Sequence, residues 1–182
     1  MIHLNLNELI DRVFGHQPFQ AENIPINTAI PTPFNADCHR INASILERIE
    51  GAVRTYQSVD TVITDYEAEA ANYPEEFFNS LTPPSFPQHE LTLKVGTIVM
   101  LLRNLNVKVN LCNGTRLIVR DLGQYHIEAE IINFDARLSD KRMLLPQIDF
   151  VSGNSPLPFV MRRRQFPLRL SYCMTINKSQ GS

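Results

Sequence analysis

Apolar residues recur at helical spacing in two segments near the N-terminus, and this pattern predicts two amphipathic helices. The first covers 7–14, where Asn5 or Asn7 can serve as the N-cap. The second begins at Asn35, which we expect to cap it. Its apolar positions follow at intervals of three, four and four: Cys38, Ile41, Ile45 and Ile49. A short apolar strand within 27–32 precedes this helix, so the segment is predicted to be a strand–turn–helix unit of an α/β layer.

The middle of the chain is acidic and rich in proline. No basic residue occurs between Arg54 and Lys94. We expect its carboxylates to lie on a solvated surface: Asp60, Asp65, Glu67, Glu69, Glu75 and Glu76. A short helix is predicted to start at Pro74. Its buried edge would consist of Phe77, Phe78 and Leu81. The prolines within 83–87 then predict a stiff connector.

From residue 91 onward the apolar pattern takes the two-residue period of β-strands. Four strands are predicted: 93–103, 116–122, 125–132 and 143–148. The third alternates most clearly, with Ile127, Ala129 and Ile131 on one face. Asn113-Gly114 is a strong signal for a tight turn. Several short strands at this spacing predict a small barrel.

The last apolar run, 168–174, is predicted to be a buried strand that returns to the α/β layer. The fold class is therefore α/β with an inserted small all-β barrel. Four divisions are expected: 1–59 as the first α/β part, 60–90 as an acidic, helical and proline-rich connector, 91–150 as the barrel, and 151–182 as the return to the α/β part.

The net charge of −2 conceals a strong asymmetry. Residues 1–93 carry 4 basic and 13 acidic side chains, whereas residues 94–182 carry 13 basic and 6 acidic ones. No carboxylate follows Phe150. This balance indicates an anionic partner, nucleic acid, for the second half. The alternative is that the two halves neutralise each other.

The cysteine pattern and the hydropathy narrow the class of protein. Three widely spaced cysteines lack zinc-ligand spacing and fit reduced thiols of an intracellular protein: Cys38, Cys112 and Cys173. The first residues lack the pattern of a signal peptide. No apolar stretch approaches the roughly 20 residues that span a bilayer, so no membrane partner is expected.

The residues that follow the final strand suit phosphate contact. They are Thr175, Asn177, Lys178 and Ser179. Hydroxyls, an amide and a cation at the carboxyl end of a buried strand can hold a phosphate backbone without reading bases. The alternative is an ordinary helix N-terminus capped by Thr175. Thr32 and Asn35 are expected to act in the same way from the other strand–helix turn, unless Asn35 is a plain N-cap.

The basic run Arg162, Arg163 and Arg164 offers a further phosphate contact. Side chains of an extended run alternate between two faces, so not all three can face one groove. We expect one or two of them to contact an acidic neighbour or the barrel. Arg163 is selected as the candidate contact to DNA.

Several blocks in order resemble one helicase family. The block Met174-Thr-Ile-Asn-Lys-Ser-Gln-Gly181 resembles motif V of Pif-type DNA helicases, including those of Helitron transposons. Ile30-Pro-Thr-Pro-Phe-Asn35, followed by Ile41-Asn42, resembles motif IV. The stretches 91–106 and 111–116 are similar to the insert of that family, and Arg163-Arg-Gln-Phe-Pro-Leu-Arg169 leads into motif V.

The resemblance implies a partial RecA-like second motor domain that carries an SH3-like barrel. It also implies a nuclear, ATP-dependent helicase of superfamily one that moves five-prime to three-prime along single-stranded DNA. Gln180 and Gly181 would couple strand binding to the nucleotide. The complete helicase would use ATP and magnesium, and this chain alone would hold no cofactor.

The sequence also departs from the family. It contains no Gly-x-x-x-x-Gly-Lys phosphate loop, and the first motor domain and motif VI are missing. Ser182 stands where the family usually has glutamine. We therefore expect a piece of a helicase that does not hydrolyse ATP alone. Two alternatives stay open: a non-enzymatic protein-binding adaptor and a non-functional transposon remnant.

Overall fold

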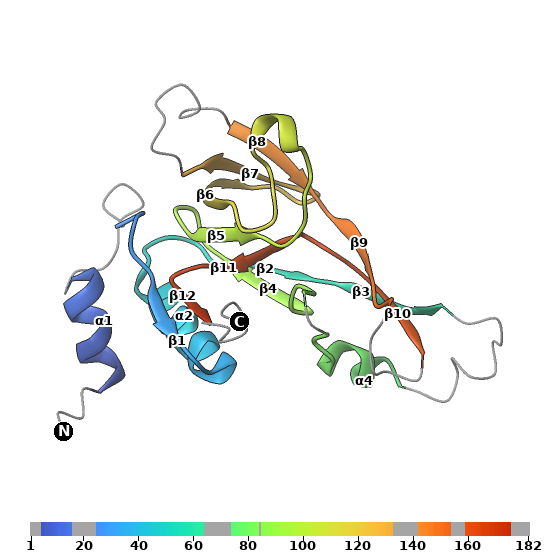
Figure 1. The fold of residues 1–182 in the computed structure, drawn as a ribbon, viewed down its shortest axis with the longest axis horizontal. Helices are drawn as coiled ribbons and strands as arrows, with labels where there is room; N and C mark the ends of the chain where they lie inside the picture. Colours follow the sequence, from blue (N-terminus) through green and yellow to red (C-terminus); the bar gives the residue numbers. More distant parts are fainter. Residues whose placement is uncertain are drawn as a thin grey trace, which may run out of the picture.

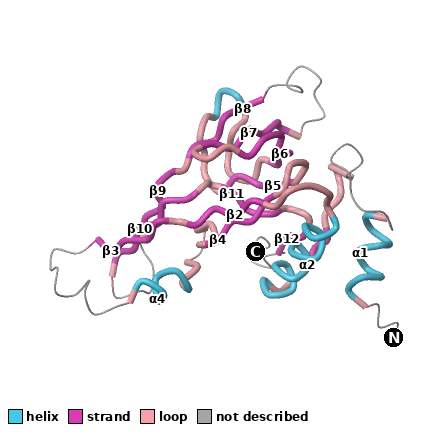
Figure 2. Tube along the Cα trace, turned by 180° about the vertical axis from the view of Figure 1, so that it is seen from behind, coloured by secondary structure: helices cyan, strands magenta, loops and turns pink. Residues whose placement is uncertain are grey.

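The computed structural model describes residues 5–15, 25–63, 74–83, 85–132, 142–153 and 159–175. This part of the chain is mixed α/β, as predicted, and most of its regular structure is strand. Figure 1 shows a helical layer at one end, a five-stranded sheet in the upper middle and a narrow three-stranded sheet at the other end. Figure 2 shows the same arrangement from behind. No helix among the described residues is long and apolar enough to cross a membrane.

Helix α1 (Leu6–Phe14) confirms the first predicted helix and its cap. The Asn5 side chain accepts a hydrogen bond from the Glu8 N–H at 2.9 Å, and the Glu8 carboxylate accepts one from the Asn5 N–H at 3.1 Å. This reciprocal pair satisfies two of the helix's free donors. An ion pair between Arg48 and Asp11 joins α1 to the next helix.

Helix α2 (Asn35–Arg48) presents the predicted apolar face to the core. Three of its expected inner positions are buried: Ile41, Ile45 and Ile49. At its C-terminal end Lys94 Nζ donates to the Ile49 carbonyl oxygen at 2.7 Å. A cation there satisfies a free carbonyl and complements the negative end of the helix dipole. This bond ties the helical layer to the sheet region.

Strands β1 (Ile30–Thr32) and β12 (Cys173–Thr175) pair in parallel beside α2. Their register sets Ile30 opposite Cys173 and Thr32 opposite Thr175. Parallel pairing of two strands that are far apart in sequence brings their carboxyl ends to the same edge. The strand–turn–helix unit predicted around 27–49 is therefore present, and the C-terminal strand completes it.

The prediction of one strand over 168–174 is wrong, because the chain changes sheets within this run. Strand β11 (Leu168–Leu170) pairs with the five-stranded sheet, and β12 follows in the helical layer. The break falls at Ser171, whose N–H donates to the Ile98 carbonyl at 3.0 Å. The next carbonyl, of Tyr172, accepts from the Ile30 N–H at 2.8 Å.

The five-stranded sheet occupies the place of the predicted barrel. Its order is β11-β5-β6-β7-β8, with β5 (Ile98–Leu101), β6 (Arg116–Leu122), β7 (His126–Ile131) and β8 (Arg142–Pro146), all antiparallel neighbours. The predicted phase of β7 is confirmed, because Ile127, Ala129 and Ile131 are buried. The strand predicted over 93–103 is two strands, β4 (Glu90–Leu93) and β5. Gly96, at φ 87°, lies in the turn between them.

Four further strands were not predicted. Strand β2 (Arg54–Gln57) pairs with β4. Strands β3 (Val59–Ile63), β10 (Val160–Gln165) and β9 (Ile148–Val151) form the three-stranded sheet in that order. The short helix α4 (Glu75–Ser80) lies against β3 and confirms the helix predicted near Pro74. The expected boundary between residues 59 and 60 falls inside β3.

Candidate nucleic-acid interface

The edge formed by the carboxyl ends of β1 and β12 brings two predicted groups of site residues together. Thr32 and Thr175 are opposite each other in the parallel pair, and Asn35 begins the helix that follows β1. The Thr32 hydroxyl oxygen accepts a long hydrogen bond from the Phe34 N–H at 3.4 Å, which shapes the turn. The carboxyl ends of two strands that the sequence suggested separately thus meet at one edge, where Thr32 is 7% exposed and Asn35 is open to solvent.

Asn35 does not cap α2 with its side chain, so that prediction is wrong. The N-cap position belongs to Phe34, whose backbone is extended, and no side-chain capping bond is present. Asn35 is the first helical residue and is exposed. The amide group of Asn35 therefore remains directed to the surface beside Thr175.

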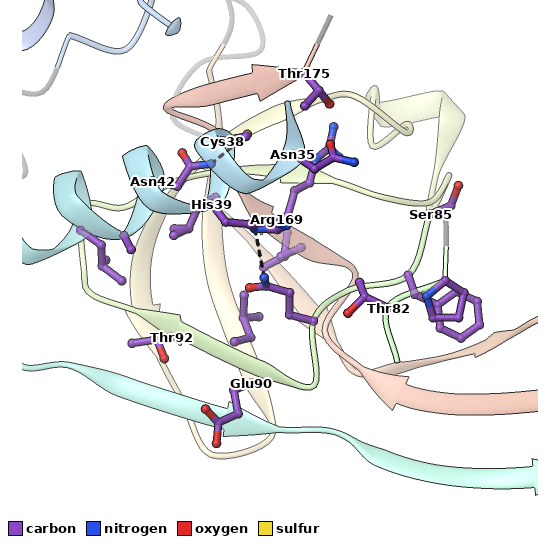
Figure 3. A pocket seen from close by; sticks show the side chains of 18 residues that line it. Asn35, Cys38, His39, Asn42, Thr82, Ser85, Glu90, Thr92, Arg169 and Thr175 are labelled. Carbon is purple, nitrogen blue, oxygen red and sulfur yellow. Dashed lines mark hydrogen bonds between the residues drawn. The ribbon is translucent and has the colours of Figure 1, made fainter. Parts of the chain in front are cut away.

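A pocket of about 420 Å³ adjoins this edge. It lies between the first turns of α2, the segment from Thr82 to Thr92, and β11. In Figure 3, Asn35 and Arg169 lie on the side nearer Thr175, and Glu90 and Thr92 lie on the far side. The volume is within the range of ligand pockets. Polar side chains make up more than half of the lining residues.

One hydrogen bond crosses this pocket. Gln88 Nε2 lies 3.0 Å from His39 Nδ1 and joins the 82–92 segment to α2. Both side chains are exposed, so the bond can open to solvent at low cost. Arg169 is exposed and makes no ion pair within the described residues; its nearest recorded partner is the Met100 sulfur at 3.6 Å.

A buried asparagine holds β12 against α2. Asn42 Oδ1 accepts from the N–H groups of Tyr172 at 3.0 Å and Cys173 at 2.9 Å. Its Nδ2 donates to the Cys173 carbonyl at 3.2 Å. The Cys38 thiol donates to the same carbonyl at 2.9 Å. Because buried polar groups are costly unless paired, this set fixes the position of the strand that ends at Thr175.

Two titratable groups near β12 are shifted by burial. Burial raises the pKa of the Tyr172 hydroxyl, whose oxygen accepts from the Ile98 N–H at 2.8 Å. Burial also raises the pKa of the Cys173 thiol, and the neighbouring Cys38 adds to the shift. Both groups therefore stay protonated and neutral in the folded chain, and they act as packing and anchoring groups. The described structure has no disulfide between these free cysteines.

Arg163 is buried, so its selection as a DNA contact is wrong. Its guanidinium is fully buried and donates to both carboxylate oxygens of Asp60, at 2.8 and 2.6 Å. It also donates to the carbonyls of Pro87 at 2.9 Å and Phe78 at 3.1 Å. The prediction that Asp60 lies on a solvated surface is also wrong, because its side chain is 0% exposed. This ion pair joins β10, β3, α4 and the proline-rich segment.

The alternation predicted for the basic run is confirmed. Arg162 and Arg164 are exposed on the other face of β10, where Arg162 donates to Thr61 at 3.1 Å and Arg164 lies 3.5 Å from Asp149. The cation that reaches the pocket is instead Arg169, which the sequence reasoning missed as a site residue. The alternation Leu168-Arg169-Leu170 in a strand was the available signal, because it turns arginine away from the core.

The remaining predicted site residues lie outside the described part of the chain. They are Asn177, Lys178, Ser179, Gln180 and Gly181. Within the described ranges, no group of three or more His, Cys, Asp or Glu side chains could hold a metal ion. The sequence has no phosphate loop either.

Comparisons with known proteins show that this chain is similar to one family. A profile described as the 2B domain of DNA helicase Pif1 matches residues 76–122, which run from α4 through β6. The ATP-dependent DNA helicase PIF1 of the zebrafish Danio rerio is 27% identical over 157 residues, which cover 80% of this chain and 20% of that protein. The chain is related to the Pif1 DNA helicases. It spans about a fifth of the length of the zebrafish protein.

Solved Pif1 structures share the fold. Unliganded Pif1 from Bacteroides sp matches with a TM-score of 0.59 and 26% identity over 85% of this chain and 44% of that chain. Bacteroides Pif1 bound to ssDNA matches with a TM-score of 0.57 and 25% identity over 85% of this chain and 32% of that chain. In the Pif1-like chain the pocket lies between the stretch that matches the 2B domain and the helical layer with β11.

Proposed function

We propose that this Pif1-like chain is part of an ATP-dependent DNA helicase and supplies contacts to single-stranded DNA. The DNA strand lies across the edge formed by Thr32, Asn35 and Thr175 and continues past Arg169. The observation that carries the proposal is the in-register pairing of Thr32 with Thr175 next to an exposed arginine without an ion-pair partner among the described residues. Hydroxyl, amide and guanidinium groups are the usual contacts to phosphate and sugar.

The charged side chains of the pocket favour one of its sides for the DNA strand. Arg169 and Asn35 lie nearer Thr175, whereas the Glu90 carboxylate lies on the far side (Figure 3). A carboxylate repels phosphate, and an unpaired arginine attracts it and releases counterions from the strand. The strand would therefore follow the side of α2 and β12. Asn177, Lys178 and Ser179 would extend this path, and Gln180 and Gly181 would couple it to the nucleotide.

Several properties of the parent helicase belong to the same proposal. They are the RecA-like nature of residues 1–59 and 151–182, the SH3-like barrel of residues 91–150, and the connector at 60–90. The fold shared with Pif1 helicases and the match of residues 76–122 to their 2B domain support them. ATP and magnesium would be held by a first motor domain, and the parent protein would be intracellular and nuclear.

The test is a titration of labelled oligonucleotide at low and moderate salt. Weak binding with little sequence preference is expected, with a dissociation constant of roughly 10⁻⁴–10⁻⁵ M. Arg169→Ala should weaken binding for all sequences and reduce the salt slope by roughly 0.7, as expected for one lost phosphate contact on a single strand. Lys178→Ala should do the same. Arg164→Ala is the matched control, because Arg164 is exposed outside the pocket beside Asp149.

Equal binding curves for the wild type, Arg169→Ala and Lys178→Ala would contradict the proposed interface. The adaptor interpretation would then be preferred, provided that the variants retain the melting temperature of the wild type.

A further inference from the structure

Phe34 is an exposed aromatic residue placed within the proposed DNA edge. Its side chain is 64% exposed, although Phe is commonly buried in folded proteins. Among the described aromatic side chains, only Phe34 and Tyr125 are more than half exposed. Phe34 stands between Thr32 and Asn35, which are both proposed phosphate contacts. An isolated exposed apolar residue needs no explanation, so its position within this edge is what matters.

The backbone around Phe34 is well fixed. Its N–H donates to the Thr32 hydroxyl oxygen at 3.4 Å, and its carbonyl oxygen accepts from the Cys38 N–H at 3.1 Å. The ring therefore projects from an ordered N-cap between a strand and a helix of 14 residues. The ring is carried by a hydrogen-bonded backbone and stands largely in solvent, where a flat partner can cover it.

We propose that Phe34 stacks on one base of the bound single strand, an inference that rests on the proposed function. A strand whose phosphates contact Thr32, Asn35 and Thr175 must direct its bases away from those groups. Phe34 is adjacent in sequence to Asn35, and its largely exposed ring can accept the face of a base that the backbone leaves unstacked. Every base has a π face, so the contact would add affinity without sequence preference.

The expected loss of affinity follows from base stacking at other sites that bind single-stranded nucleic acid. Loss of one stacked aromatic should weaken binding by about 5-fold to 150-fold, equivalent to ~1–3 kcal/mol per base. The loss should appear only when the strand carries bases. A strand of abasic sugar–phosphate of the same length keeps the phosphate contacts and removes the stacking partner.

The experiment measures the affinity of the full chain for oligothymidylate and for an abasic strand of equal length. The wild type should bind the thymidylate strand more tightly. Phe34→Ala should reduce that preference by at least about 5-fold and leave affinity for the abasic strand unchanged. Phe34→Tyr should keep the preference. Tyr125→Ala is the matched control, because Tyr125 is exposed in the turn between β6 and β7 and should have no effect.

The outcomes separate the two proposals. If wild type binds neither strand, the proposed function and the stacking proposal both fail. If wild type binds and Phe34→Ala weakens both strands equally, or neither, stacking alone is refuted. Melting temperatures establish that each variant is folded. If Phe34→Ala unfolds, Phe34→Leu replaces it, and retention of the base preference by leucine would overturn the stacking proposal.

Discussion

Replacement of Arg163 tests whether the buried ion pair holds the three-stranded sheet to α4 and the proline-rich segment. Arg163→Met keeps most of the aliphatic stem but removes every donor of the guanidinium. Among the described residues, the buried Asp60 carboxylate would then keep the hydrogen bond from the Ser58 hydroxyl at 2.8 Å. His89 Nδ1 would lie 3.8 Å from its other oxygen. The carbonyls of Pro87 and Phe78 would also lose their donors.

The expected loss of stability follows from the burial of the Arg163–Asp60 ion pair. Both side chains of the Arg163–Asp60 pair are 0% exposed, so removal of one partner leaves an uncompensated charge out of contact with water. Breaking such a pair costs about 3–5 kcal/mol of the free energy of unfolding. The adjacent Arg164 has a side chain that is 58% exposed and lies 3.5 Å from Asp149. Loss of an exposed pair of this kind costs about 0–1 kcal/mol.

Urea denaturation followed by circular dichroism compares Arg163→Met with Arg164→Met. The first variant should lose several times more stability than the second, and the double variant Arg163→Met with Asp60→Leu should recover part of the loss. Equal midpoints for the two single variants would refute the reasoning. If the midpoints agree and Arg163→Met instead flattens the salt dependence of DNA binding, Arg163 would be a phosphate contact after all.

Three further predictions concern the core, pH and catalysis. Ile131→Ala should lower the free energy of unfolding by about 2–5 kcal/mol, whereas Glu130→Ala should cost much less; equal melting temperatures would show that the phase of β7 is wrong. Because the pKa values of Tyr172 and Cys173 are raised, the folded chain keeps protons that the unfolded chain loses at alkaline pH. Stability measured by urea titration should fall above about pH 9, by up to ~1.4 kcal/mol per pH unit for each group, and a rise would contradict this. The pure chain should not hydrolyse ATP, and DNA-stimulated turnover abolished by Lys178→Ala would disprove that expectation.

Local periodicity was sufficient to predict the helices and the central strands. The intervals of Ile41, Ile45 and Ile49 and the alternation in 126–131 are each set by contacts to one core, so they appear in the sequence itself. The fold class and the strand–turn–helix unit followed from them. The order of the motif blocks indicated the helicase resemblance, which the comparisons confirmed.

Two of the strands that were missed, β3 and β10, carry polar side chains on their inner face. Strand β10 buries Arg163 and Gln165, which a hydrophobic pattern assigns to solvent. Gln165 Nε2 donates to the carbonyls of Tyr56 at 3.0 Å and His89 at 2.9 Å. These partners are far away in sequence, so burial of the polar side chains depends on the assembled fold.

The candidate site was predicted in part. Thr32 and Thr175 follow buried strands, and the carboxyl ends of parallel strands meet at one edge. Arg169 was not selected because its access to the pocket depends on the pairing of β11 with β5 and on the position of the 82–92 segment. The capping of α2 by the backbone of Phe34 was likewise invisible, since Asn35 is a common capping residue type.

The most direct measurement is an NMR titration of the isotopically labelled chain with a short oligothymidylate. Oligonucleotide is added well beyond the expected dissociation constant of roughly 10⁻⁴–10⁻⁵ M. The account predicts that the amide signals of Thr32, residues 34–37, Arg169 and Thr175 shift together along one binding curve, while the non-proline amide signals of 142–151 do not move. Shifts confined to β7 and β8, or no shift at saturating oligonucleotide, would contradict the proposed single-strand interface.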